Sequence, residues 1–149
     1  MLLFFFSAKG QLPEIYLETT ENEEVLISEL QGSELTVVDF WATWCKPCLI
    51  AIPELVKIYG EFSDSGVSFI GINIDSPRNK AKIRPFAEAR GITYPVLMDT
   101  DQEMMHEMNV VQVPTLIIFD KNGKQVFVHE GFNPGDQELL REKILELLK

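Results

Sequence analysis

Cysteine is scarce in this chain of 149 residues, which has only Cys45 and Cys48, three positions apart. Without further thiols the sequence can supply neither a four-thiolate zinc site nor a disulfide-rich scaffold. A chain of this length buries about 68–70% of the surface that its unfolded form exposes, so it needs neither for stability. The only histidines, His106 and His129, have no ligand spacing to the cysteines. We therefore expect no metal site and no bound cofactor.

Positive charge is also scarce. Only 13 Lys and Arg residues accompany 23 Asp and Glu residues, which gives a formal net charge of -10. Because nucleic-acid binding depends on a basic face that displaces counterions, this balance argues against a nucleic-acid partner. The stretch between Gly10 and Cys45 holds eight carboxylates and no Lys or Arg. It is either a solvated face that aids solubility or a docking surface for a basic partner.

The sequence has no hydrophobic run long enough to span a membrane. The strongest candidate is Met1–Phe6 (MLLFFF), shorter than a membrane span of about 20 residues and than a signal-peptide core of about 7–15. Residues 1–10 are either the remnant of an export signal or anchor, or a disordered or packed terminus. For residues 11–149 the length predicts a single domain.

Short apolar runs rich in β-branched and aromatic residues predict buried strands. They lie at 35–40, 67–74, 94–98, 115–119 and 125–129. Between the last two, Asn122-Gly123 is typical of a tight hairpin turn, so we expect those strands to be antiparallel. A further strand or hairpin is expected within 11–30.

Helical spacing fills the gaps between these strands. One apolar stripe runs from 49 to 66 with a kink expected at Pro53. A second helix is expected within 79–90, closed by Gly91 as a C-cap and either continuous or broken into two pieces at Pro85. A short helix is predicted over 102–108. The last is predicted to start with Asn133 as N-cap and Pro134 as its first residue. The order β-α-β-α-β-α-β-β-α from residue 35 predicts an α/β sandwich with a mixed sheet.

The chemically informative segment is 40–48, FWATWCKPC, between a predicted strand and a helix start. Two thiols at i and i+3 of a helix N-terminus can close a small disulfide with little backbone movement. The free N–H groups, the helix dipole and Lys46 all favour a thiolate at Cys45, and such settings lower a thiol pKa from ~8.5 to ~3.5–7.5. This pattern favours reversible oxidation over half a metal site or a structural disulfide. A peroxidase would want Thr or Ser three residues before the cysteine, where Ala42 stands.

The run 38–48, VDFWATWCKPC, resembles the active-site segment of the thioredoxin superfamily, and Val113-Pro114-Thr115 resembles its second signature, a proline in cis. The longer stretch between them and the N-terminal extension are similar to the TlpA/ResA-like branch of thiol-disulfide oxidoreductases. The resemblance implies a thioredoxin-like three-layer α/β/α sandwich with a mixed central sheet, an N-terminal extension and an extra αβ insertion at 76–98.

The resemblance also implies roles for individual residues. Cys45 would be the exposed nucleophile and Cys48 the more buried resolving thiol. Pro114 would pack opposite the pair, and Val113 would present its backbone to an extended substrate. Asp39 would be the buried acid. Independently, a carboxylate between apolar strand residues is desolvated, which raises its pKa and suits it to exchange a proton with Cys48, unless it is merely an exposed aspartate at a strand end.

Further residues around the cysteines are expected to contact substrate. Trp44 offers a flat apolar surface beside the nucleophile, and Lys46, Pro47 and Thr115 complete the expected substrate-binding set. Trp41 is expected to pack against the sheet. Two positions depart from the family pattern: Ala51 stands where cytochrome-maturation members carry a glutamate, and Gly71 is expected to face Asp39 where thioredoxin has a lysine.

The function implied is a monomeric thiol-disulfide oxidoreductase that reduces protein disulfides and receives electrons from an upstream dithiol protein. Its implied place is periplasmic or otherwise extracytoplasmic, in a thiol-reducing or cytochrome c maturation pathway. A general cytosolic thioredoxin-like reductant is the nearer alternative. A redox-responsive module that binds a protein partner without turnover is the other.

Overall fold

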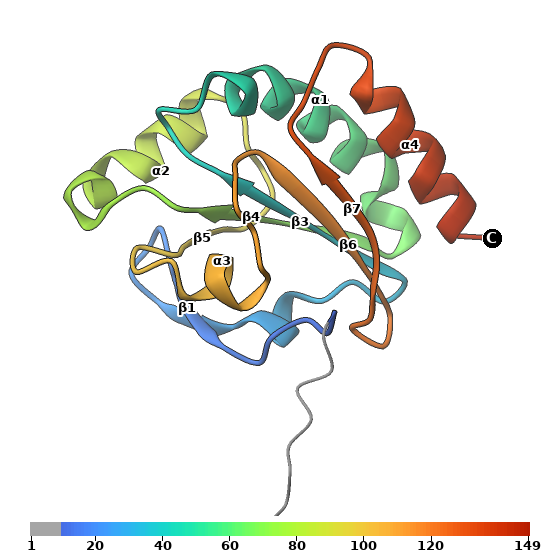
Figure 1. The fold of residues 1–149 in the computed structure, drawn as a ribbon, viewed down its shortest axis with the longest axis horizontal. Helices are drawn as coiled ribbons and strands as arrows, with labels where there is room; N and C mark the ends of the chain where they lie inside the picture. The colour runs from blue at the N-terminus through green and yellow to red at the C-terminus, as the bar shows by residue number, and fades with distance from the viewer. Residues whose placement is uncertain (1–9) are drawn as a thin grey trace, which may run out of the picture.

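The computed structural model describes residues 10–149, and the expectation for Met1–Phe6 lies outside them. Seven strands form one sheet in the order β2-β1-β5-β4-β3-β6-β7 (Figure 1). Their bounds are β1 Tyr16–Thr19, β2 Glu24–Leu26, β3 Leu35–Trp41, β4 Val67–Asn73, β5 Val96–Met98, β6 Thr115–Asp120 and β7 Gln125–Glu130. The helices are α1 Lys46–Phe62, α2 Lys80–Ala89, α3 Glu103–Glu107 and α4 Asp136–Leu147, with 3-10 turns η1 Ile27–Leu30, η2 Ser63–Ser65 and η3 Pro77–Asn79.

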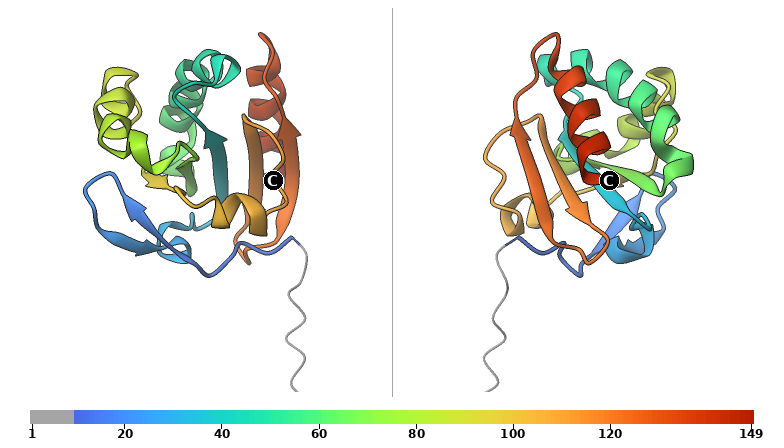
Figure 2. Two further views of the ribbon diagram at one scale, coloured as in Figure 1. Left: turned by 60° about the vertical axis from the view of Figure 1, so that its left-hand side comes forward. Right: turned by 90° about the vertical axis from the view of Figure 1, so that its right-hand side faces the viewer.

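The sheet is mixed and layered as expected. β3, β4 and β5 are parallel neighbours, whereas β6 runs antiparallel to both β3 and β7. Helices α1, α2 and α4 cover one face, and the short α3 lies on the other (Figures 1 and 2). The expected N-terminal hairpin is β1–β2, and the expected αβ insertion is α2 with β5. Within 10–149 no helix is both long and apolar enough to cross a bilayer.

Strand β3 is the centre of the molecule, and all seven of its residues are buried. Side chains alternate between the two faces of a strand, so Leu35, Val37 and Asp39 point the same way. Leu35 and Val37 pack in one hydrophobic cluster with Leu55 of α1. Asp39 is thereby directed into the layer between the sheet and α1.

The expected start of the last helix is wrong. Helix α4 begins at Asp136 after Gly135, whose φ is +105°, and not at Pro134. The cause is a side-chain contact: the Asp136 carboxylate accepts the Asn133 N–H at 2.8 Å and meets the His129 ring at 3.0 Å. The turn 133–135 is closed by these bonds and precedes the helix.

Pro85 lies inside a helix without interrupting it, whereas Pro95 directly precedes a strand and marks its start. Helix α2 runs unbroken through Pro85, because Ile83 and Ala87 on either side are both buried in the core. Strand β5 starts only at Val96, shorter than expected, and Pro95 before it contributes its carbonyl to the Gly71 N–H at 2.8 Å. Gly91, with φ +74°, follows α2 as expected of a C-terminal glycine.

Candidate active site

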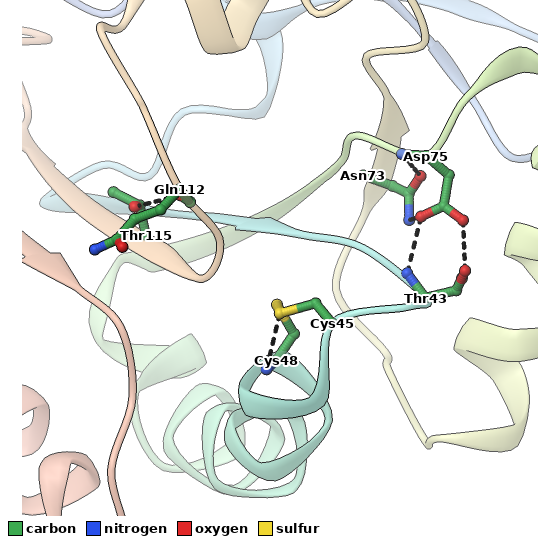
Figure 3. The surroundings of a disulfide bond; sticks show 7 residues. All are labelled: Thr43, Cys45, Cys48, Asn73, Asp75, Gln112 and Thr115. Carbon is green, nitrogen blue, oxygen red and sulfur yellow. Dashed lines mark hydrogen bonds between the residues drawn. A yellow bond between two sulfur atoms is a disulfide. The ribbon is translucent and has the colours of Figure 1, made fainter.

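The two cysteines lie at the junction between β3 and α1. Cys45 is the N-cap of α1 and is joined to Cys48 by a disulfide with a Cα–Cα distance of 5.3 Å. The Cys48 N–H points at the Cys45 Sγ at 3.2 Å (Figure 3). Thus one sulfur receives an N–H of the first helical turn, the group that stabilises a thiolate when the bond is reduced.

The charge around this helix end favours a thiolate further. The first turn of α1 contains no acidic residue, and it opens with Lys46 and Pro47. The Lys46 side chain is exposed beside the N-cap. A cation and the positive end of a helix dipole both lower the pKa of a neighbouring thiol.

The exposure of the cysteines differs from the expectation. Cys48 is 1% exposed as expected, but Cys45 is only 4% exposed. Both belong to the hydrophobic cluster that contains Trp41 and Ile52, and Val113 packs against that cluster. In the disulfide form, therefore, the outer cysteine is more covered than the resemblance implies.

The proline loop is held beside the cysteines by strand pairing. The Val113–Pro114 peptide bond is cis as expected, and Thr115 directly after it pairs with Phe40 of β3. The Pro114 carbonyl accepts the Gly131 N–H at 2.8 Å. Since β3 leads straight into the Cys45 loop, this pairing brings the two motifs to one end of the sheet.

Thr115 does not fit the expected role in substrate binding. Its side chain is 2% exposed, and its hydroxyl donates to the Gln112 carbonyl at 2.8 Å (Figure 3). The hydroxyl is committed to closing the loop before Pro114. Val113, by contrast, is half-buried and retains an accessible surface.

The two tryptophans of the motif are used differently. Trp41 is 1% exposed and stacks on Phe86 of α2 with ring centres 5.9 Å apart, which confirms its expected packing role. Trp44, one residue before Cys45, is 63% exposed. With the exposed Lys46 and Pro47 it forms the accessible rim of the disulfide.

Asp39 is buried, so the exposed strand-end alternative is wrong. It is 2% exposed, and desolvation raises its pKa from 3.8 to about 8. Its Oδ1 has no hydrogen-bond partner among the described residues. A carboxyl group in this setting is protonated through most of the neutral range and can exchange a proton near pH 8.

The surroundings of Asp39 are set by Gly71, its register partner on β4, as the sequence indicates. A Cβ at Gly71 would lie 3.2 Å from Trp41 Nε1 and 3.3 Å from the Tyr94 ring. The pKa of Tyr94 is raised by burial and by the charge of Asp39. Aromatic rings thus occupy the place that a lysine would need, and among residues 10–149 no cation offsets the charge of Asp39.

Sequence reasoning missed Asp75, which is fully buried and bonded to the loop before Cys45. A signal was available in Asn73 and Asp75, polar residues that directly follow an apolar strand parallel to β3. The carboxyl ends of parallel strands lie at the same sheet edge, so these residues are placed beside the cysteine loop.

A disulfide at a helix N-terminus, at the same end of a mixed α/β sheet as a cis proline, defines a thiol-disulfide oxidoreductase of the thioredoxin fold. Comparison with known proteins agrees: the chain belongs to the AhpC/TSA family, whose model matches residues 8–127. It is 30% identical over 142 residues to the thiol-disulfide oxidoreductase ResA of Halalkalibacterium halodurans, covering 95% of this chain and 77% of that protein. For ResA of Bacillus subtilis the identity is 30% over 125 residues, 84% of this chain and 68% of the relative.

Solved structures give the same result. A protein from Chlorobium tepidum, assigned as the thiol:disulfide interchange protein DsbE, superimposes with a TM-score of 0.85 at 28% identity, covering 95% of this chain and 98% of that one. A thioredoxin-like protein from Porphyromonas gingivalis matches with a TM-score of 0.78 at 34% identity, over 93% and 92% of the two chains. The resemblance to ResA-like oxidoreductases is confirmed.

Proposed function

We propose that the protein reduces disulfide bonds in extracytoplasmic protein substrates and receives its electrons from another dithiol protein. The observation that carries this proposal is the Cys45–Cys48 bond at the N-terminus of α1, beside the cis Val113–Pro114 loop. Only reduced Cys45 and Cys48 can donate electrons, so the disulfide form is the product of one turnover. An upstream dithiol returns it to the reduced form.

The first step is attack by the Cys45 thiolate on one sulfur of the substrate disulfide. A Cys45–substrate disulfide forms, the substrate S–S bond breaks, and the second substrate sulfur leaves as a thiolate that takes a proton. The helix N-terminus and Lys46 lower the pKa of the attacking thiol. The backbone of Val113 pairs with the extended substrate and aligns its sulfur with Cys45.

The second step is attack by Cys48 on the Cys45 sulfur. This forms the intramolecular disulfide, breaks the bond between Cys45 and the substrate, and releases the first substrate sulfur as a thiolate that takes a proton, so that two electrons have passed from the cysteine pair to the substrate. Cys48 must lose its proton first. Asp39 lies in the layer between β3 and α1 with a pKa of about 8, which suits it to take that proton.

The likeness to ResA and DsbE oxidoreductases supports the extracytoplasmic location. Ala51, buried at 1% exposure in α1, has no acidic function to offer near the pair, so we propose general protein disulfides rather than cytochrome c thiols as substrates. Fractionation of cells expressing the tagged protein separates this proposal from a cytosolic reductant, for which the protein would stay in the cytoplasmic fraction.

A trap identifies the substrates. With Cys48→Ala the mixed disulfide on Cys45 has no resolving thiol, so we expect covalent complexes that disappear on treatment with dithiothreitol. They are detected on non-reducing gels and identified by mass spectrometry. The double variant with Cys45→Ser is the matched control, because it retains the fold and has no thiol. An absence of thiol-linked complexes, together with no reduction of insulin by the wild type, would overturn the proposal.

Trp44→Ala tests the exposed rim. Loss of an exposed indole beside the disulfide should raise KM for a protein disulfide by about tenfold, because contact surface with the polypeptide is lost. The KM for a small aromatic disulfide should change less. Tyr16→Ala is the matched control, since Tyr16 is 62% exposed on β1, three strand positions from β3. Equal effects of the two variants on KM would contradict a substrate role for Trp44.

A further inference from the structure

Asp75 is a buried carboxylate that the sulfur chemistry does not use. It lies two residues past the end of β4 and is 0% exposed. Its Oδ1 accepts the Thr43 N–H at 2.8 Å and the Asn73 side-chain amide at 3.1 Å, and its Oδ2 accepts the Thr43 hydroxyl and the Asn79 side-chain amide, the latter at 3.1 Å. Figure 3 shows the contacts to Thr43 and Asn73 beside the disulfide.

These bonds join three segments of the chain. Thr43 lies in the loop between β3 and α1, Asn73 ends β4, and Asn79 ends η3. The Asp75 N–H in turn donates to the Asn73 side-chain carbonyl at 2.9 Å. Thr43 is held by both its main chain and its side chain. The position of Thr43 is therefore fixed, and this limits the positions of the next two residues, Trp44 and Cys45.

The loop has few other anchors. The Ile74 N–H reaches the Trp41 carbonyl at 2.9 Å, and the Cys45 N–H reaches the Ala42 carbonyl at 3.2 Å. Neither bond involves Thr43 or Trp44. Asp75 therefore supplies the attachment for the part of the loop that carries the exposed indole and leads into the N-cap cysteine.

The contacts of Asp75 also bear on its charge. All four donors to Asp75 are neutral, and four accepted bonds are the pattern of an ionised carboxylate. A buried carboxylate is costly unless its hydrogen bonds are satisfied, and here they are, with no Lys, Arg or His among its partners in the part of the chain that the structure describes. The carboxylate accepts two hydrogen bonds from Thr43, two residues before Cys45, whose thiol must ionise.

We propose that Asp75 is a positioning residue for the reactive thiol: it fixes the Thr43–Cys45 segment, and its buried charge opposes formation of the Cys45 thiolate. The helix N-terminus and Lys46 favour that thiolate, so Asp75 balances them. The attacking thiol works best when its pKa is near the ambient pH, and an opposing charge keeps it from falling far below. This inference rests on the proposed role of Cys45 as nucleophile.

Asp75→Asn tests the charge. The reduced variant should be alkylated by iodoacetamide at Cys45 about three- to tenfold faster than the wild type at pH 6, with both rates converging at high pH, because a nearby negative charge has been removed. Peptide mass spectrometry distinguishes Cys45 from Cys48. Alkylation does not depend on any protein substrate, so this result stands apart from the outcome of the insulin and trapping experiments.

Asp99→Asn is the matched control for loss of a buried carboxylate. Asp99 is also 0% exposed, but it accepts the Met104 and Met105 N–H groups at the start of α3, on the opposite face of the sheet. Its variant should lose stability and keep the wild-type alkylation profile. If Asp75→Asn and Asp99→Asn give the same profile, Asp75 has only a structural role and the proposal fails.

Thr43 gives a second test that does not depend on Asp75→Asn being folded. Thr43→Val removes the hydroxyl bond and keeps the carboxylate, whereas Thr43→Ser retains both bonds. We expect the valine variant to lose about three- to tenfold in kcat/KM for insulin, with the pH profile of Cys45 alkylation unchanged, and the serine variant to stay within about twofold. Indistinguishable valine and serine variants would overturn the positioning role.

Discussion

Replacing Cys45 with serine should abolish disulfide reduction, lowering kcat/KM for a protein disulfide by at least about a thousandfold. The serine hydroxyl does not ionise at neutral pH and does not exchange with disulfides. The mixed disulfide with the substrate therefore cannot form, and no later step can follow. The chain has no third cysteine to take over. The measurement is the dithiol-dependent precipitation of insulin, corrected for the rate without protein.

Cys48→Ala provides the comparison that gives this result its meaning. It should also lose steady-state turnover, yet it should still form one covalent bond per molecule with the substrate, because Cys45 and the helix N-terminus are unchanged. Retention of more than about 1% of wild-type turnover by Cys45→Ser would show that Cys45 is not the attacking thiol. Full partner binding without turnover in the wild type would favour the binding-module alternative.

Local patterns were sufficient for most of the fold. The apolar runs that predict β3 and β4 are buried in the sheet from end to end or nearly so, and Asn122-Gly123 does close the β6–β7 hairpin. In each case the cause lies within a few residues, so the pattern and the structure coincide. The prediction for the start of α4 failed because one of the two bonds that close the turn before it, from His129 to Asp136, comes from a different element.

The site divides in the same way. The cysteines and the cis proline lie in short contiguous motifs, and these are identifiable without knowing the fold. The environment of Asp39 is only partly of this kind: the resemblance predicts Gly71 opposite it, but Tyr94 comes close only through the pairing of β3 with β4 and of β4 with β5. Asp75 meets Thr43 across a separation of 32 residues for the same reason. Such contacts depend on strand order, which no local pattern specifies.

Asp39→Asn should stabilise the disulfide form of the protein, and increasingly so as the pH rises. The pKa of Asp39 is about 8 in the folded protein, against 3.8 for the ordinary carboxyl. Between these values the folded protein holds a proton that the unfolded chain has released, so the free energy of unfolding falls as the pH rises. Below the lower value, and above the higher one, Asp39 adds no further pH dependence.

The magnitude follows from that interval. Asparagine does not titrate, so the free energy of unfolding of the variant relative to the wild type should grow by about 3–4 kcal/mol between pH 5 and pH 8. Urea unfolding at several pH values measures it. Asp64→Asn is the control, because Asp64 is exposed on η2 and its replacement should give a curve parallel to the wild type. Parallel curves for Asp39→Asn would contradict the raised pKa.

The same substitution should carry a kinetic cost. If Asp39 accepts the Cys48 proton, the asparagine variant resolves the mixed disulfide more slowly near pH 7 and loses the part of the pH–rate profile that follows Asp39 ionisation. Rapid mixing of the reduced protein with a labelled disulfide substrate separates this step from the first attack. A variant that is more stable yet slower would explain why β3 keeps a buried carboxyl that has no cationic partner among residues 10–149. Burial of this group lowers stability and supplies a base that works near neutral pH. Unchanged resolution with raised stability would instead leave Asp39 without a catalytic part.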